Sequence, residues 1–150
     1  MDNSREVMIV EDDECTRSLL AALVAYYGFR PEPVSDGTAA LARLKGATSG
    51  LVVLDLFLPH TNGFEVLREL KSTQPEVLRR TIVLTAASSR TTAGCIELNQ
   101  VWKVLKKPVD VLEFVQELQA CCAASLAEHT RPSADARKAR AGAQQERDTH

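Results

Sequence analysis

The amino-acid sequence predicts an α/β protein with a five-stranded parallel sheet and helices on both faces. Short apolar runs alternate five times with segments of helical spacing, which is typical of a doubly wound sheet. The run Leu51–Leu54 is apolar at every position, as in a strand buried on both faces. The run Phe29–Val34 contains Pro31 and Pro33, which cannot donate to a ladder and confine it to a sheet edge. A right-handed sheet with strand order 2-1-3-4-5 places this second strand at an edge.

The predicted strands are, in chain order, Val7–Val10, Phe29–Val34, Leu51–Leu54, Thr81–Thr85 and Val101–Leu105. Four predicted helices begin at residues suited to a helix N-terminus, namely Asp13 and Glu14, Asp36, Asn62 and Asp110. Gly28 and Gly46 are expected to end the first two helices. A weaker helical stretch covers about residues 89–98, and residues 72–80, which contain Pro75, are expected to form a loop or a broken turn.

Length and composition indicate an ordinary globular protein. The 150 residues are enough for one domain with a core, and a net charge of -2 gives no basis for binding nucleic acid or membranes through bulk charge. No apolar run approaches the roughly 20 residues that span a bilayer, and no secretory signal precedes the first strand. The cysteines, at positions 15, 95, 121 and 122, lack zinc-site or CxxC spacing and are expected to be small, mostly buried residues. We therefore expect a cytoplasmic protein without membrane insertion or direct nucleic-acid contact.

The chain is expected to divide into a folded domain, residues 1–127, and a flexible tail, residues 128–150. Apolar periodicity stops near Glu128, and residues 131–150 contain no large apolar side chain. About 20 residues beyond the last helix are too few for a helix-turn-helix domain, so the expected readout is protein–protein contact.

Functional groups follow the predicted strands where each strand ends. The first strand is followed by Glu11 and Asp12, the third by Asp55, the fourth ends at Thr85, and the fifth runs into Lys107. Because the carboxyl ends of parallel strands share one edge of the sheet, these groups are expected to converge on one shallow pocket. Taken singly, Asp55 could be a loop cap, Thr85 an ordinary strand residue and Lys107 a solvated lysine. Their joint occurrence favours a site.

The chemistry of this set favours phosphoryl transfer. Three crowded carboxylates repel one another unless a cation relieves them, and Mg²⁺ is a hard ion that takes oxygen ligands. An aspartate carboxylate can attack phosphorus and form an acyl phosphate. A divalent ion, a lysine ammonium and a threonine hydroxyl are suited to stabilise the phosphoryl oxygens during that transfer.

These residues also carry a family resemblance. The motif residues Val10-Glu11-Asp12, Asp55 with Pro59 and Gly63, Thr85-Ala86 and Lys107-Pro108 resemble the receiver domain of bacterial two-component response regulators, over about residues 5–127. The resemblance implies a flavodoxin-like fold of the stand-alone, chemotaxis-regulator type. It further implies that Asp55 accepts a phosphoryl group from a histidine kinase or phosphotransfer protein, as a signalling switch or phosphorelay shuttle rather than an enzyme.

The resemblance assigns the remaining roles. Asp12 would bind Mg²⁺ directly, Glu11 would help through water, and the backbone carbonyl of Phe57 would complete the protein ligands with Asp55. Lys107 would pair with the phosphoryl group, Thr85 would move to hydrogen-bond it, and Pro108 would follow a cis peptide bond. The output would be a downstream protein target, with the chain a monomer or weak homodimer.

Several positions depart from the pattern. Val104 stands where receivers often carry the aromatic partner of the threonine switch, residues 97–100 replace the usual small residues before the fifth strand, and Trp102 is in a different register. Phe57 and Ala87, at the two positions that tune dephosphorylation, offer no acid or amide to orient water, which predicts slow self-dephosphorylation.

Three alternatives compete with the phospho-acceptor. Val104 and the altered segment before it leave open a receiver-like docking module that works without phosphorylation. A dehalogenase-like phosphatase would require a second acidic residue at the position of Phe57. A flavin-binding protein would want a glycine- or hydroxyl-rich loop where Glu11, Asp12 and Asp13 would repel phosphate.

Overall fold

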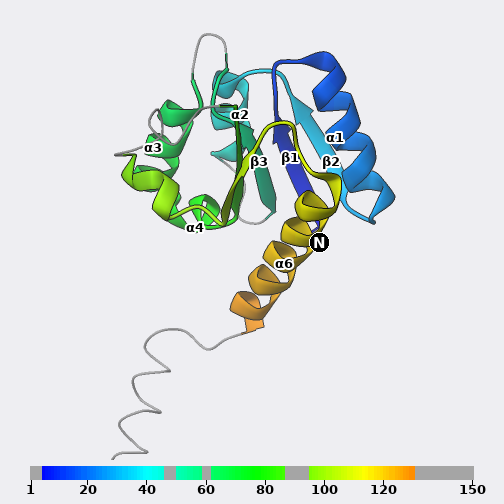
Figure 1. Cartoon of the computed structure of the whole chain (residues 1–150). Coiled ribbons are helices and arrows are strands. Elements are labelled where there is room, and N and C mark those ends of the chain that lie inside the picture. The colour runs from blue at the N-terminus through cyan, green and yellow to red at the C-terminus, as the bar shows by residue number, and fades with distance from the viewer. Residues whose placement is uncertain (1–4, 46–49, 59–61, 87–94, 131–150) are drawn as a thin grey trace, which may run out of the picture.

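The computed structural model (Figure 1) describes residues 5–45, 50–58, 62–86 and 95–130. Within these residues, five parallel strands form one sheet in the order β2-β1-β3-β4-β5, which confirms the predicted α/β fold and strand order. The strands are β1 (Glu6–Val10), β2 (Arg30–Val34), β3 (Leu51–Asp55), β4 (Thr81–Thr85) and β5 (Lys103–Lys106). The helices are α1 (Glu14–Tyr26), α2 (Gly37–Leu44), α3 (Gly63–Thr73), α4 (Pro75–Leu78), the 3-10 helix η1 (Ile96–Asn99) and α6 (Val111–Thr130).

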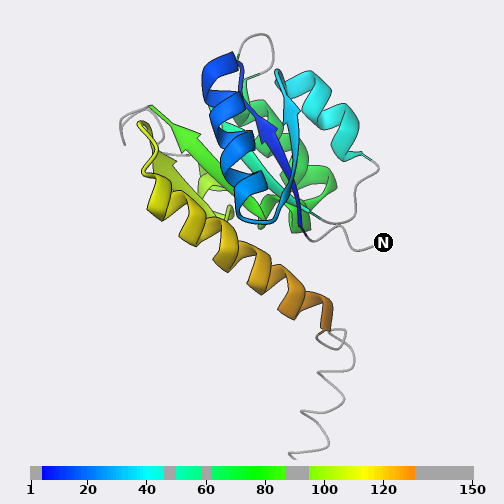
Figure 2. The ribbon, with the colours of Figure 1, turned by 90° about the vertical axis from the view of Figure 1, so that its right-hand side faces the viewer.

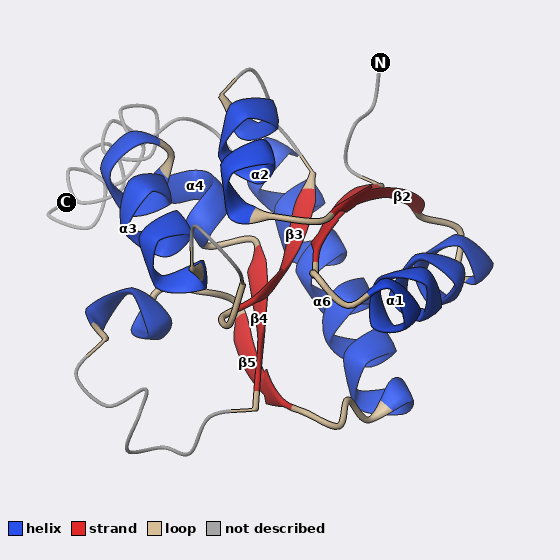
Figure 3. Ribbon diagram, turned by 90° about the horizontal axis from the view of Figure 1, so that it is seen from above, coloured by secondary structure: helices blue, strands red, loops and turns tan. Residues whose placement is uncertain are grey.

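Helices cover both faces of the sheet. Viewed along the sheet from above, α2, α3 and α4 lie on one side and α1 and α6 on the other (Figure 3). Successive residues of a strand point to opposite faces, so Val53 joins the core cluster on the α1 and α6 side, whereas Val52 and Leu54 join the cluster under α2 and α3. All five residues of β3 are buried. The continuous apolar run of this strand therefore reflects its burial on both faces.

The proline-containing strand β2 lies at the sheet edge, as predicted. The backbone N–H of Arg30 donates to the Arg5 carbonyl at 2.8 Å, and the Val34 carbonyl accepts from the Glu11 N–H at 3.1 Å. Backbone groups of a strand alternate in direction, so Pro31 and Pro33 occupy the positions whose N–H groups would point away from β1. The edge therefore tolerates both prolines without losing a ladder bond to β1.

Side-chain caps begin the helices where the sequence predicts them. Three side chains accept N–H bonds at the predicted caps: Asp13 from Thr16 at 2.8 Å, Asp36 from Ala39 at 2.7 Å and Asn62 from Glu65 at 3.0 Å. Asp110 accepts from the N–H of Glu113 at 2.9 Å. Gly28, directly after the Tyr27 C-cap, has a φ of +88°, the left-handed conformation that glycine adopts at helix ends. Gly46 lies outside the described residues.

Residues 72–80, expected to form a loop or a broken turn, are more helical than predicted. Helix α3 continues to Thr73, and a separate turn of helix, α4, spans Pro75–Leu78. Proline at the first helical position needs no N–H donor, and the buried Val77 and Leu78 anchor this turn to the core. Of the weaker helix expected at residues 89–98, only the end is described, and it forms the 3-10 helix η1.

The last helix, α6, is longer than its apolar periodicity predicts. It includes residues 128–130, which the sequence assigned to the tail, and its final turns extend beyond the sheet (Figure 2). Residues 131–150 lie outside the described residues. Of the cysteines, Cys121 and Cys122 are buried in α6, Cys95 is half-buried and Cys15 is exposed, so only half of them match the expected burial. Among the described residues, no helix is both long and apolar enough to cross a membrane.

Candidate functional site

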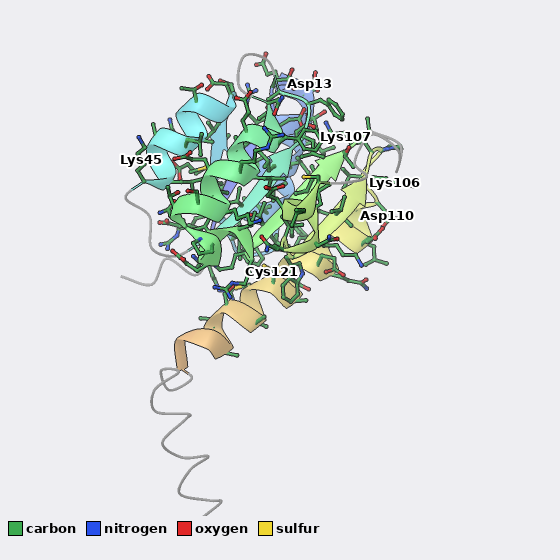
Figure 4. The ribbon with its side chains drawn as sticks, turned by 90° about the vertical axis from the view of Figure 1, so that its left-hand side faces the viewer. Asp13, Lys45, Lys106, Lys107, Asp110 and Cys121 are labelled. Atoms are coloured by element: carbon green, nitrogen blue, oxygen red, sulfur yellow. The ribbon has the colours of Figure 1, made fainter. Side chains whose placement is uncertain are left out.

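The predicted site residues lie together at the carboxyl edge of the sheet. Glu11 and Asp12 follow β1, Asp55 ends β3, and Lys107 follows β5. Asp13 and Lys107 lie at the same end of the molecule in Figure 4, opposite Cys121. The strand order β1-β3-β4-β5 brings these residues together although up to 96 positions separate them in the chain.

Lys107 connects two of the carboxylates. Its Nζ donates to Asp55 Oδ2 at 2.9 Å and to Glu11 Oε2 at 3.0 Å. The side chain is only 24% exposed, whereas those of Glu11 and Asp55 are almost fully buried. Burial lowers the pKa of Lys107, but its hydrogen bonds to Asp55 and then Glu11 outweigh burial and raise that pKa above its ordinary value. Lys107 is therefore a fixed ammonium at neutral pH.

Asp55 is held in one orientation at the end of β3. Its Oδ1 accepts a hydrogen bond from the Phe57 N–H at 3.1 Å, while its Oδ2 accepts from Lys107. The peptide after it is anchored to the next strand, since Leu56 N–H donates to the Leu84 carbonyl at 3.1 Å. The carboxylate is thus held in one orientation by donors on both of its oxygens.

Three carboxylates form an acidic cluster that fits a hard cation. Oxygen atoms of Glu11, Asp12 and Asp55 all lie within 4.8 Å of one another. Oxygens on opposite sides of a Mg²⁺ ion are about 4.2 Å apart, so this spacing is close to what one ion needs. An all-oxygen donor set with an open, solvent-facing side matches an ion that keeps several of its waters.

The pKa of Glu11 shows how crowded the cluster is. Burial raises this pKa above the ordinary value of 4.5, and the charge of Asp55 raises it further, while the hydrogen bond from Lys107 only partly offsets them. The folded protein therefore holds a proton on Glu11 more tightly than the unfolded chain does. It follows that the fold loses stability as the pH rises through 4.5 toward the raised pKa.

We accordingly expect Glu11→Gln to stabilise the metal-free protein at neutral pH, because glutamine carries no charge into the cluster. Its melting temperature should exceed that of the wild type by about 3 °C at pH 7, and the difference should vanish near pH 4. Thermal melts in a chelating buffer at both pH values measure this. A variant that melts lower at neutral pH would mean that the lost bond to Lys107 outweighs the relief of repulsion.

Thr85 and Val104 lie on the strands that flank the pocket. Thr85 is the buried last residue of β4, and its carbonyl accepts from the Lys107 N–H at 2.9 Å. Val104, in β5, is half-buried beside Val83, where the resemblance would favour an aromatic ring.

Phe57 is 47% exposed and packs edge-on against Phe64, with ring centroids 6.4 Å apart. The peptide bond before Pro108 is cis, as predicted, and Ala87 lies outside the described residues.

Two further residues shape the site through contacts that were not predicted from the sequence. Gly63, the first residue of α3, donates its N–H to the Leu56 carbonyl at 2.8 Å, and a Cβ added there would lie 2.5 Å from Leu56 Cα. Arg17, in the first turns of α1, binds the backbone of the loop that carries Glu11 and Asp12. The sequence marks Gly63 as one residue of the receiver-like motif without revealing its packing against Leu56, and it gives no signal for Arg17.

Known proteins with similar sequences are regulators. The family model of the response regulator receiver domain matches residues 7–119. The sensory transduction protein RegX3 of Mycobacterium tuberculosis is 42% identical over 66 residues, which are 44% of this chain and 29% of RegX3. The transcriptional regulatory protein GltR of Pseudomonas aeruginosa is 34% identical over 86 residues, which are 57% of this chain and 36% of GltR. These matches cover about a third of each curated relative's length.

Solved structures show the same fold at lower identity. The signal receiver domain of an HD domain-containing protein from Pseudomonas fluorescens aligns with a TM-score of 0.75 and 22% identity, covering 88% of this chain and 96% of that one. The response regulator TrrA from Thermotoga maritima, in complex with Mg(2+)-BeF, aligns with a TM-score of 0.69 and 21% identity, covering 78% of this chain and 98% of that one. With the sheet order, the acidic cluster and the family match in agreement, this chain belongs to the receiver domains of two-component response regulators.

Proposed function

We propose that the chain is a phospho-acceptor switch in which Asp55 receives a phosphoryl group from a phosphohistidine of a histidine kinase or phosphotransfer protein. The observation that carries this proposal is the Lys107 ammonium, 2.9 Å from the Asp55 carboxylate at the open edge of a receiver sheet. A lysine ammonium in this position can stabilise the negative charge that develops on the phosphoryl oxygens during transfer.

The residues present fit a bound Mg²⁺ ion. Asp55 and Asp12 would hold it directly, Glu11 through water, and the backbone carbonyl of Phe57 would complete the protein ligands. Bound there, the ion would neutralise the acidic cluster and stabilise negative charge on the phosphoryl oxygens. The exposure of Asp12 supports this role, because a ligand at the rim can meet an ion that keeps part of its water shell.

The transfer itself is an exchange of one bond at phosphorus. A carboxylate oxygen of Asp55 attacks, the new P–O bond forms, and the P–N bond to the donor imidazole breaks, with its electron pair left on the nitrogen that then takes a proton. Lys107 would pair with the transferred group, and the Thr85 hydroxyl would donate to it. The protein would thereby promote only its own phosphorylation and dephosphorylation.

The signal would leave the domain through a protein–protein contact. Phosphorylation adds negative charge at a fixed point, and a two-state element near β4 and β5 would respond to it. Val104 beside this element is smaller than an aromatic ring, so the threonine would act without that partner. Residues 1–127 would form the receiver domain and residues 128–150, the first three of which continue α6, its tail, with a kinase and a downstream protein as partners.

The decisive experiment is the mass of the intact protein after incubation with acetyl phosphate and Mg²⁺. One phosphoryl adduct is expected, and it should be absent with Asp55→Asn or with a chelator. Donor-independent binding of a partner, with no adduct under conditions that load another receiver domain, would favour the phosphorylation-independent docking module instead.

The adduct is expected to decay slowly. Attack by water on the acyl phosphate is faster when a nearby side chain orients the water, and the exposed Phe57 has no group that can do so. Mass measurements during decay should give a lifetime well beyond seconds in the wild type, and Phe57→Asn should shorten it. A wild-type lifetime of seconds, or an asparagine variant that decays no faster, would contradict this role for Phe57.

A further inference from the structure

Arg17 reaches from α1 to the loop that carries the acidic cluster. Its Nη1 donates to the carbonyl of Glu11 at 3.0 Å and to the carbonyl of Asp12 at 3.2 Å. One guanidinium nitrogen thus binds two successive peptide groups of the β1–α1 loop. The side chain is half-buried, so these contacts form in a setting that water only partly screens.

Arg17 donates to backbone carbonyls and not to carboxylates, which affects whether the acidic cluster can bind a metal ion. In the described part of the chain, Arg17 lies within ion-pair distance of no carboxylate, although four acidic residues in a row, 11–14, precede it. A guanidinium bound to the carboxylates would compete with a metal ion for the same oxygens. Bound to carbonyls, Arg17 instead leaves the carboxylate oxygens of Glu11 and Asp12 available while its charge reduces repulsion among them.

Besides the Arg17 contacts and the long hydrogen bond from the Asp13 N–H to Glu11 Oε1 at 3.4 Å, the described contacts of the loop backbone lie at its two ends. The Glu11 N–H bonds to Val34 at the start of the loop, and the Asp13 side chain caps α1 at its end. Asp12 lies between these points, and its side chain is exposed, so the direction of its carboxylate depends on the backbone that carries it. The Arg17 contact to the Asp12 carbonyl holds that backbone.

We propose that Arg17 is a positioning residue for the cation site: it fixes the Glu11–Asp12 backbone so that the Asp12 carboxylate faces Asp55. The inference rests on the proposed function only in taking Mg²⁺ as the ion. Arg17 itself touches neither the ion nor the phosphoryl group. Its loss should therefore weaken Mg²⁺ binding and leave the transfer step intact, in the way that partners of metal ligands act.

The test compares Arg17→Ala and Arg17→Lys with the wild type by calorimetric titration with MgCl₂, without any phosphodonor. For Arg17→Ala the Mg²⁺ dissociation constant should rise about tenfold, and for Arg17→Lys, which keeps the charge and a donor, about threefold or less. The control is Arg43→Ala, which removes the same charge from an exposed ion pair between Arg43 of α2 and Glu32 of β2. That variant should bind Mg²⁺ within a factor of about two of the wild type.

A second measurement separates positioning from a general loss of structure. With acetyl phosphate as donor, the Mg²⁺ concentration for half-maximal adduct formation should rise in Arg17→Ala while the rate at saturating Mg²⁺ stays within about twofold. A lower saturating rate with an unchanged Mg²⁺ constant, or wild-type Mg²⁺ binding, would overturn the proposal. If Arg17→Ala fails to fold, Arg17→Lys and Arg17→Gln carry the same comparison, and equal Mg²⁺ constants in those two would overturn it. Failure of the wild type to form an adduct would count against the proposed function alone, since the titration needs no donor.

Discussion

Replacing Lys107 with methionine is expected to lower the melting temperature of the metal-free protein by about 6 °C, or about 2 kcal/mol of unfolding free energy. The buried carboxylates of Glu11 and Asp55 would lose the ammonium that lies 2.9 to 3.0 Å from each. Removing one partner of a fully buried pair costs more than this, but the Lys107 side chain is 24% exposed, and water would compensate part of the loss. Because its pKa is raised in the fold, Lys107 contributes this stability below its ordinary value of 10.5 while its partners are ionised, and the contribution is lost as the pH rises through the raised pKa.

Magnesium should reverse most of this loss. The ion and the ammonium are alternative cations for one acidic cluster, so Mg²⁺ should raise the melting temperature of Lys107→Met by more than that of the wild type. The matched control is Lys106→Met, since Lys106 is the exposed neighbour labelled beside it in Figure 4. Thermal melts of the three proteins with and without MgCl₂ measure the effect. Equal Mg²⁺ stabilisation of the wild type and Lys107→Met would show that the ion does not occupy this cluster.

Gly63→Ala should cause a comparable loss for a steric reason. The added Cβ would lie 2.5 Å from Leu56 Cα and 2.7 Å from the Asp55 carbonyl oxygen, and both contacts are with backbone. The N-terminus of α3 must then move away from the end of β3, at a cost of about 3 kcal/mol. Since the same backbone carries Asp55, we expect weaker Mg²⁺ binding together with lower stability in denaturant unfolding.

Gly28→Ala is the control for Gly63→Ala. Gly28 needs glycine for its φ of +88° and not for space, since an added Cβ would meet only the Arg5 side chain at 3.7 Å. It lies at the C-terminus of α1, away from the pocket, so its substitution should cost about 1 kcal/mol and leave Mg²⁺ binding unchanged. If Gly63→Ala unfolds at the same denaturant concentration as the wild type, the close approach of α3 to β3 is not maintained in solution.

The sequence predicts the strand ends well because a strand buried on both faces is a continuous apolar run, and the run stops where the strand ends. Four apolar residues precede Asp55, and a similar run precedes Glu11, so the edge of the sheet can be located to the residue. The topology then brings these acids to one place. That Lys107 bonds to Glu11 as well as Asp55 could not be predicted, because it depends on side-chain conformations that strand positions alone do not determine.

Contacts between loops and helices are harder to predict from the sequence than the strand ends are. Arg17 is one of several basic residues on the helix surfaces, and only the path of the β1–α1 loop makes it a donor to Glu11 and Asp12. For the helical turn at Pro75–Leu78 the sequence predicts a loop or a broken turn, because proline usually interrupts a helix. Burial against the core stabilises this turn as a helix, and a linear pattern of four residues does not reveal that burial.

The two prolines of β2 have a consequence for the behaviour of the protein in concentrated solution. An open sheet can grow by accepting a strand from another molecule, and the N–H groups on its outermost strand are what such a strand would bind. In β2 the outward positions are Pro31 and Pro33, which carry no N–H, while the neighbouring Arg30 bonds inward. The outward edge of β2 therefore offers an incoming strand carbonyl acceptors but no N–H donors at these two positions, which disfavours extension of the sheet through β2.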